Sequence, residues 1–305
     1  MRLVFAGTPS AAVPTLRRLA AEHDILAVVT RPDAPLGRRR VLTASPVAQT
    51  ADELGIPLIK AARLDDEATA AIAALRPELG VIVAYGGLVR EPLLSTPDAG
   101  WINLHFSLLP AWRGAAPVQR ALIAGDEVLG ASVFQLVPAL DAGDVFATLE
   151  VDVPADATAD VALNILAERG AALTAEVVSA IAVGTARALP QVGDATLAAK
   201  LTIDDGLLDW NLPSQAVFSR FRGVTPEPGA HTTVDGVRVK ILEASPTDDS
   251  TLAPGEIVAT KHVLLIGTAD AALAVARVQP AGKGAMNAVD WWRGQRSTEG
   301  LRAGS

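Results

Sequence analysis

The sequence contains no cysteine and only four histidines, which stand far apart along its 305 residues. The lack of cysteine excludes disulfides, thiol nucleophiles and cysteine-ligated metal sites, so we expect no metal site. The longest apolar run, residues 79–89, is bounded by charged residues and is too short to cross a bilayer. The N-terminus shows neither a signal-peptide nor a transit-peptide pattern. We therefore expect a cytoplasmic protein with no membrane segment.

A basic overall composition is also absent, because the net charge is -8 at pH 7. This charge argues against a protein that wraps nucleic acid over its whole surface, although a local basic cluster can still steer a polyanion. One such cluster is the loop RPDAPLGRRR, at residues 31–40. Its arginines are either a solvated loop, which is the common case, or a set of phosphate contacts. The phosphate-binding loops GxGxxG and GxxxxGK[ST] are missing, so the sequence gives no support for a dinucleotide or NTP.

Alternating strand and helix patterns fill the first half of the chain. Short apolar runs such as RLVFAGT, DILAVVT and ELGVIVAYG alternate with segments of helical spacing such as VPTLRRLAAEH. Continuous apolar strands are typical of parallel sheets that are covered on both faces. This half therefore predicts an α/β fold with a doubly wound parallel sheet.

The pattern changes after Gly130. Two strand-like runs, ASVFQLV and VFATLEVDV, flank the turn-rich segment PALDAGD and predict a hairpin. A long amphipathic helix is expected to follow and to end at Gly184, and short strand patterns with Asp-Gly turns near the C-terminus predict a small β-barrel or sandwich. We expect a catalytic domain at 1–188, a linker at 189–203 and a β domain at 204–305.

Asn103 and His105 stand two residues apart at the end of the strand pattern WINL. Alternate residues of a strand point to the same face, and ligands of open α/β sheets bind beyond the carboxyl ends of the strands. An amide and an imidazole on one face suit a developing oxyanion. Asp141, in the turn LDAGD, is the candidate that orients the imidazole and favours its protonated form. Each residue alone has a simpler interpretation as a strand cap, a turn contact or an Asx-turn.

The combination of these motifs resembles a known family. NLHFSLLPAWRGAAPVQRAL followed by LDAGD is similar to the pattern of folate-dependent formyltransferases, and FAGTPSAAVPTLRRL, KLTIDDGLLDW and VQPAGKGAM resemble the methionyl-tRNA formyltransferases. The resemblance runs from Val4 to about Trp292. It implies a Rossmann-like domain, an OB-like β-barrel domain that binds tRNA, and transfer of formyl from 10-formyltetrahydrofolate to the methionine amino group of initiator methionyl-tRNA.

The resemblance also implies the roles of the catalytic residues. Asn103 and a protonated His105 would stabilise the oxyanion of acyl transfer. Asp141 would sustain the imidazolium and help to relay a proton toward the leaving folate nitrogen. Neither a metal nor a covalent intermediate is implied.

The folate is implied to lie beside the strand end VAYGGLV, the SLLP turn and the turn before Asp141. Without the resemblance, the Gly86-Gly87 pair would be interpreted as a plain strand-to-helix turn. The implied folate-binding residues are Val83, Ala84, Tyr85, Gly86, Gly87, Leu88, Ser107, Leu108, Leu109, Pro110, Val137 and Leu140.

The basic loop is implied to enter the acceptor arm of the tRNA. Its implied tRNA-binding residues are Arg31, Arg38, Arg39 and Arg40. Arg38 matches the arginine after glycine in the family pattern Pro-x-Gly-Arg, whereas Arg39 replaces a common glycine. Phe106 is a second departure, since the family commonly has a small residue after the histidine.

Two other functions remain open from the sequence. The same chemistry could act on a small amine, such as an amino sugar nucleotide or glycinamide ribonucleotide, but the basic loop and barrel domain argue against it. A non-catalytic RNA-binding protein would have no need of Asn103, His105 and Asp141 together. No segment has the pattern of a long apolar interface helix, so we expect a monomer.

Overall fold

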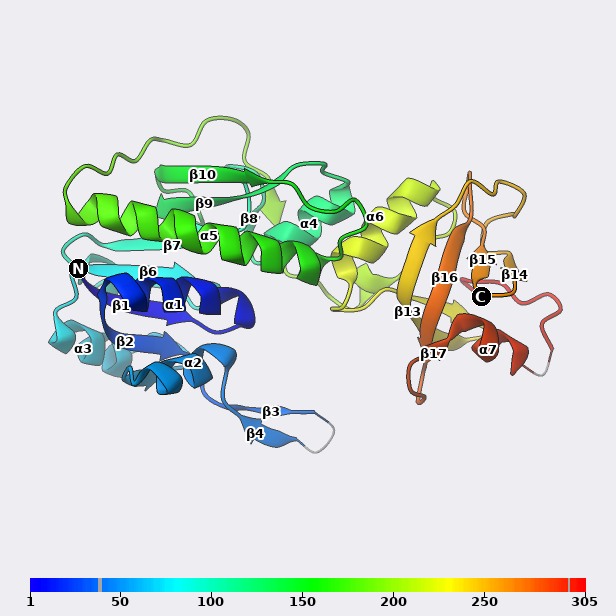
Figure 1. Cartoon of the computed structure of the whole chain (residues 1–305), viewed down its shortest axis with the longest axis horizontal. Coiled ribbons are helices and arrows are strands. Elements are labelled where there is room, and N and C mark those ends of the chain that lie inside the picture. Colours follow the sequence, from blue (N-terminus) through cyan, green and yellow to red (C-terminus); the bar gives the residue numbers. More distant parts are fainter. Residues whose placement is uncertain (38–39, 296) are drawn as a thin grey trace. The chain divides into compact units, whose positions relative to one another are not determined.

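The structure is a computed structural model that describes residues 1–37, 40–295 and 297–305. Figure 1 shows its helices and strands in chain order. The chain forms two units, which are described separately below. The first comprises Met1–Pro117, Val128–Asp152 and Leu163–Ala198, and the second Val118–Glu127, Val153–Ala162 and Ala199–Ser305. The bounds 1–188, 189–203 and 204–305 stay a prediction.

A seven-stranded sheet forms the centre of the first unit, in the order β10-β9-β7-β6-β1-β2-β5. The strands from β7 to β5 are parallel, which confirms the predicted α/β architecture. β9 is antiparallel to β7 and to β10, so the predicted hairpin extends the parallel sheet at one edge. The strands are β1 (Arg2–Gly7), β2 (Asp24–Thr30), β5 (Leu58–Lys60), β6 (Leu79–Val83), β7 (Trp101–His105), β9 (Leu129–Gln135) and β10 (Val145–Val151).

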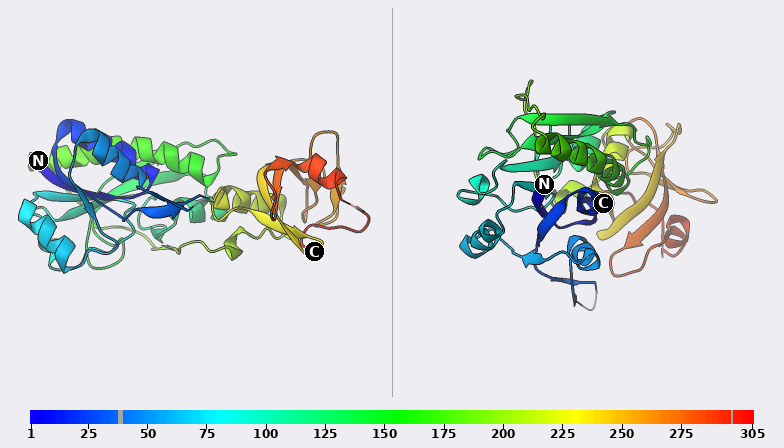
Figure 2. Two further views of the ribbon diagram at one scale, coloured as in Figure 1. Left: turned by 90° about the horizontal axis from the view of Figure 1, so that it is seen from below. Right: turned by 60° about the vertical axis from the view of Figure 1, so that its left-hand side comes forward.

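Helices cover both faces of this sheet (Figure 2). On one face, α5 packs on β7 so closely that a Cβ at Gly170 would lie 2.9 Å from the Leu104 side chain. On the other face, Ile72 of α3 packs against Val4 and Ala6 of β1. Two of these helices, α2 and α3, have side-chain N-caps: Ser45 and Asp65 accept hydrogen bonds from backbone N–H groups of the first turn. The elements are η1 (Ser10–Ala12), α1 (Val13–Glu22), α2 (Pro46–Leu54), α3 (Asp66–Leu75), η2 (Leu93–Ser95) and α5 (Ala159–Ala182).

The pairing of β6 with β7 depends on one glycine. Gly80 faces Trp101, and a Cβ at Gly80 would lie 2.1 Å from the indole ring. The buried indole Nε1 donates to the Leu93 carbonyl at 2.8 Å, so Trp101 also anchors η2. Because Trp101 begins β7, these contacts fix the strand that ends at His105.

The second unit contains a curled antiparallel sheet in the order β12-β13-β16-β15-β14, with β17 paired to β16. This confirms the predicted small β domain. β12 and β13 are joined by Asp235 and Gly236, whose φ angles of 51° and 68° are those of a tight hairpin turn. The elements are α4 (Pro117–Ala124), η3 (Asp204–Gly206), α6 (Ser214–Val224), β12 (His231–Val234), β13 (Val237–Pro246), β14 (Ile257–Ala259), β15 (Leu264–Ile266), β16 (Leu273–Pro280), β17 (Met286–Asn287) and α7 (Ala288–Arg293).

Aromatic residues fill the core of the second unit. Trp210 and Phe221 are buried there, together with Trp291 and Trp292 of α7. The Trp pair therefore packs the C-terminal helix into the core, and its rings are not free to stack on a nucleic-acid base. α6 lies in a region where the sequence patterns predicted only short strands.

Two small sheets complete the fold, and both belong to loops near the predicted sites. β3 (Ala34–Leu36) pairs with β4 (Val41–Thr43), and β8 (Arg113–Gly114) pairs with β11 (Leu197–Ala198). Across the described ranges, no helix is long and apolar enough to traverse a membrane.

Candidate active site

Strand β7 presents Asn103 and His105 on the same face of the sheet. Asn103 lies between Ile82 of β6 and Phe134 of β9, and Ile82 belongs to the core cluster under α3. His105 is the last residue of β7 and is 6% exposed. The strand pattern WINLH therefore places both side chains on one face of the sheet.

His105 is held by contacts on both ring nitrogens. Nε2 lies 2.8 Å from the Trp112 carbonyl, and Nδ1 lies 3.9 Å from Asp141 Oδ2. Because a carbonyl only accepts hydrogen bonds, Nε2 carries a proton and Nδ1 faces the carboxylate. Phe134 packs edge-on against the ring, with the two centroids 6.4 Å apart.

Three effects act on the pKa of His105, which was expected to be protonated. Burial lowers the pKa of His105, and this effect outweighs the Asp141 carboxylate and the Trp112 carbonyl, which both raise the pKa. The neutral imidazole with a proton on Nε2 is therefore the favoured resting form. Asp141 does act in the predicted direction, but burial is the larger effect.

Asp141 lies in the turn between β9 and β10. Its backbone has a φ of 44°, a conformation that Asp and Asn tolerate better than most residues. Oδ2 accepts a hydrogen bond from the backbone N–H of Gly114 at 2.8 Å. Gly143 keeps the turn tight, because a Cβ there would lie 1.8 Å from the Gln135 carbonyl oxygen. The turn thus points the carboxylate toward His105.

Asn103 contributes a buried polar atom without a hydrogen bond. Its Oδ1 is inaccessible to solvent and has no hydrogen-bond partner among the residues that the structure describes. An unpaired buried acceptor costs free energy unless a partner arrives.

The predicted folate segment after β6 combines exposed backbone with buried anchors. Ala84 and Gly86 are exposed and have positive φ angles of 48° and 74°, and Leu88 is 65% exposed. Tyr85 is buried instead, and its hydroxyl donates to the Ala61 carbonyl at 2.9 Å. Burial raises the pKa of Tyr85, which keeps the phenol protonated. Val83 is also fully buried, so these two residues can meet a ligand only through their backbone.

The other predicted folate residues also include both buried and partly exposed side chains. The Ser107 hydroxyl is buried and donates to the Ala111 carbonyl at 2.6 Å, so it shapes its own loop. Leu108, Leu109, Pro110 and Val137 are partly exposed, and Gly87 is partly covered by Tyr85. Leu140 is 54% exposed in the turn that leads to Asp141.

Of the four predicted tRNA-binding arginines, the two that the structure describes, Arg31 and Arg40, lie in different surroundings. Arg31 donates to the Gly86 carbonyl at 2.8 Å and to the Tyr85 carbonyl at 3.4 Å, so it lies on the predicted folate segment. Arg40 is exposed at the tip of the β3–β4 hairpin. Arg38 and Arg39 lie outside the described residues. Asp33 is paired with Lys60 at 2.7 Å.

Sequence reasoning missed two residues around the site, Gln191 and Thr196. Gln191 bridges Arg113 and the Asp141 turn, and Thr196 accepts a hydrogen bond from the Trp112 N–H at 2.8 Å. Gln191 and Thr196 lie in the segment that was predicted to be a linker. That segment has neither a period-2 nor a helical pattern, so nothing in the sequence alone indicated that it is fixed.

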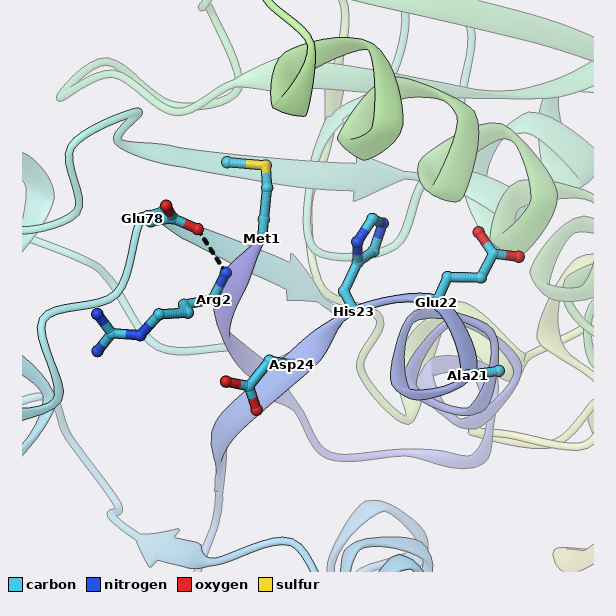
Figure 3. Close-up of a pocket in the computed structure, with 7 residues that line it drawn as sticks. All are labelled: Met1, Arg2, Ala21, Glu22, His23, Asp24 and Glu78. Atoms are coloured by element: carbon cyan, nitrogen blue, oxygen red, sulfur yellow. Dashed lines mark hydrogen bonds between the residues drawn. The ribbon is translucent and has the colours of Figure 1, made fainter.

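A surface hollow of about 530 Å³ lies elsewhere, at the amino ends of β1 and β2 (Figure 3). It is lined by Met1, Arg2, His23, Asp24 and Glu78, among others, and none of the predicted site residues faces it. Burial lowers the pKa of His23 there, with a smaller effect of the N-terminal amine. Over the described part of the chain, no group of three or more His, Asp or Glu side chains could hold a metal ion.

Comparisons with known proteins agree with this architecture. The family profile described as "Formyl transferase" matches residues 1–178, and "Formyl transferase, C-terminal domain" matches residues 200–296. The methionyl-tRNA formyltransferase of Clavibacter sepedonicus is 61% identical over 296 residues, which cover 96% of this chain and 97% of the relative. That of Leifsonia xyli subsp. xyli is 58% identical, with the same coverage of 96% and 97%.

Solved structures share the fold at low sequence identity. An N-formyltransferase from Helicobacter canadensis, in complex with folinic acid and dTDP-3-aminofucose, gives a TM-score of 0.69 at 15% identity and covers 90% of this chain and 98% of its own. A methionyl-tRNA formyltransferase from Clostridium thermocellum gives 0.57 at 14% identity, covering 87% and 98%. Both units thus have the fold of a formyl transferase. Given the identities to the full-length relatives, the chain belongs to the family of methionyl-tRNA formyltransferases.

Proposed function

We propose that this protein transfers the formyl group of 10-formyltetrahydrofolate to the α-amino group of methionine on initiator methionyl-tRNA. The observation that carries the proposal is the meeting of Asn103, His105 and Asp141. His105 Nδ1 lies 3.9 Å from Asp141 although the two residues are 36 positions apart. Family membership then supports methionyl-tRNA as the acceptor.

Asn103 acts on the formyl oxygen. Its amide N–H group donates to the oxygen that gains negative charge when the amine attacks, a contribution of about 10² to 10³ in rate.

His105 carries the proton between the two nitrogens. In its neutral form, Nδ1 takes the proton that the α-amino nitrogen loses as the new C–N bond forms. The imidazolium formed in this way is stabilised by the Asp141 carboxylate, which faces Nδ1. The ring then returns the proton to the folate nitrogen as its bond to the formyl carbon breaks, so His105 ends neutral. In this cycle the protonated form of His105 that the resemblance implies is a transient one.

The residues after β6 and before Asp141 are suited to a flat heterocycle. Leu88 and Leu140 expose apolar side chains, and Ala84 and Gly86 are exposed in the same segment as Leu88. Apolar walls with a few fixed polar groups are typical of small-molecule sites. We assign the pterin of the folate to these segments.

The β3–β4 hairpin is assigned to the tRNA. Arg40 is at its tip, and Leu36, Val41 and Leu42 are exposed by 66%, 59% and 67%. A basic tip supplies phosphate contacts, and exposed apolar side chains can pack on unstacked bases. Arg31 is assigned instead to the edge of the folate segment, because its guanidinium is held by the Tyr85 and Gly86 carbonyls.

The protein acts in the cytoplasm, where translation begins, and as a monomer.

The test is transfer of labelled formyl from 10-formyltetrahydrofolate to purified methionyl initiator tRNA. Asn103→Ala should slow the chemical step, and Arg40→Ala should raise the KM for tRNA with little effect on kcat. Arg76→Ala is the matched control for the hairpin, because Arg76 is exposed and has the same φ of 50° as Arg40. An Arg76→Ala effect equal to that of Arg40→Ala would overturn the hairpin assignment.

The choice of acceptor is tested in the same assay. Uncharged tRNA, methionine and an amino sugar nucleotide replace methionyl-tRNA in parallel reactions. Transfer to methionyl-tRNA alone supports the proposal. Transfer to the amino sugar nucleotide with none to methionyl-tRNA would leave the chemistry in place and refute the proposed acceptor.

A further inference from the structure

Residues 189–198, here called the strap, are fixed along the loops of the candidate site. At one end, Leu189 exchanges two backbone hydrogen bonds with Val145, at 2.8 and 2.9 Å. At the other end, Leu197 and Ala198 pair with Arg113 and Gly114. The strap therefore touches both the loop after His105 and the strand after the Asp141 turn.

Gln191 is the centre of the strap. Its Nε2 donates to the carbonyls of Asp141 and Gly143 at 2.8 and 2.9 Å. Its Oε1 accepts from Arg113 Nη2 at 2.6 Å and from Nε at 3.2 Å. Among side chains of this length, only glutamine can donate to two carbonyls and accept from a guanidinium at once. Every polar atom of the amide is thus used between two loops.

These hydrogen bonds hold the backbone of the turn that carries Asp141. Asp141 has a positive φ, and its carboxylate is attached to the rest of the site through the Gly114 N–H. Gln191 holds the backbone of the same residue from the other side. Since electrostatic support of a neighbouring ring depends steeply on distance, a turn that drifts would weaken the effect of Asp141 on His105.

The strap also reaches His105 by a second route. Thr196 Oγ1 accepts from the Trp112 N–H at 2.8 Å, and the Trp112 carbonyl accepts from His105 Nε2 at 2.8 Å. The two partners of the imidazole are therefore anchored by one continuous segment. Gln191 anchors the Asp141 turn, and Thr196 anchors Trp112.

We propose that Gln191 is a positioning residue that acts on formyl transfer through Asp141. The proposal rests on the proposed function, because it concerns the proton transfer assigned to His105. Its consequence is a defect in kcat with substrate binding nearly unchanged. A merely structural role for Gln191 would lower stability without that pattern.

The experiment compares Gln191→Met with Gln191→Glu in the full chain. Methionine keeps the volume but removes all four hydrogen bonds. Glutamate keeps the acceptor for Arg113 and places an oxygen against the Asp141 and Gly143 carbonyls, so it perturbs the turn while it retains an anchor. Gln135→Met is the matched control, because Gln135 Nε2 also donates to two carbonyls, those of Trp101 and Ala99, at 3.0 and 3.5 Å.

We expect both Gln191 variants to lose about 10 to 10² in kcat, with the KM for methionyl-tRNA and for 10-formyltetrahydrofolate within about twofold. The midpoint of the acid limb of kcat should fall, because a displaced carboxylate raises the pKa of His105 less. Gln135→Met should keep both the kcat and this midpoint. Equal losses in Gln135→Met and Gln191→Met, or a change confined to KM, would overturn the proposal.

A double-mutant comparison tests whether Gln191 acts through Asp141. In an Asp141→Asn background, Gln191→Met should cost much less than in the wild type, because the carboxylate that it positions is gone. The same fold loss in both backgrounds would refute the route through Asp141. Wild-type protein that fails to formylate methionyl-tRNA at all would instead refute the proposed function.

Discussion

The replacement Asp141→Asn is the sharpest probe of the proton relay. Asparagine has nearly the same shape, tolerates the φ of 44°, and can accept the Gly114 N–H through its amide oxygen. The change therefore removes the negative charge and leaves the turn in place. The variant should unfold at nearly the wild-type temperature.

The size of the effect follows from the distance to His105. At the 3.9 Å between His105 Nδ1 and Asp141 Oδ2, two unit charges interact by about 4 kcal/mol in the effective dielectric of about 20 that suits protein sites. That figure is an upper value for the stabilisation of the transient imidazolium, and it corresponds to about 10³ in rate. The amide dipole of asparagine retains part of the interaction. We expect a fall in kcat of about 10² to 10³.

The assay is single-turnover formyl transfer with both substrates saturating, which isolates chemistry from binding and release. The same variant is followed over a range of pH. A rate within about threefold of the wild type, under conditions where chemistry limits turnover, would refute the electrostatic role of Asp141. A large loss that is accompanied by a lower unfolding temperature would assign the effect to the turn instead.

Three further predictions concern the same strand and its surroundings. His105→Ala should reduce kcat by at least about 10² in a protein that still unfolds cooperatively, and a near-normal rate would remove His105 from the mechanism. The kcat of the wild type should fall as the pH drops through the lowered pKa of His105, so the midpoint should lie on the acid side of that of free imidazole; Asp141→Asn should move it further down, because a group that raises the pKa is lost. A midpoint that rises in Asp141→Asn would contradict the assigned sign. Gly80→Ala should lower the free energy of unfolding by about 1 to 3 kcal/mol, because its methyl would meet the Trp101 ring, and urea titration measures this change.

The sequence predicted the elements whose side-chain pattern is regular. The run WINLH is β7, and the long helix expected after residue 157 is α5. The predicted hairpin is β9 and β10, which follow one another as antiparallel neighbours. In each case burial imposes a period on the sequence that can be recognised without a structure.

Other features could not be predicted because they depend on contacts between distant residues. Burial lowers the pKa of His105, whereas the sequence showed only the nearby carboxylate. The segment EPLLSTPDAG has no regular side-chain pattern and contains only the short η2 between two prolines. Gln191 has no local pattern at all, since its three partner residues lie in two other segments of the chain.

The strap has a consequence for how the protein is made. A ribosome that has synthesised residues 1–188 has already linked every predicted catalytic residue into the chain, yet Gln191 and Thr196 have not been added. The support of Asp141 and Trp112 is therefore completed by some of the last residues of the first unit. An expression fragment that ends at residue 188 would carry the catalytic side chains without their anchor, whereas one that ends at residue 198 would include it.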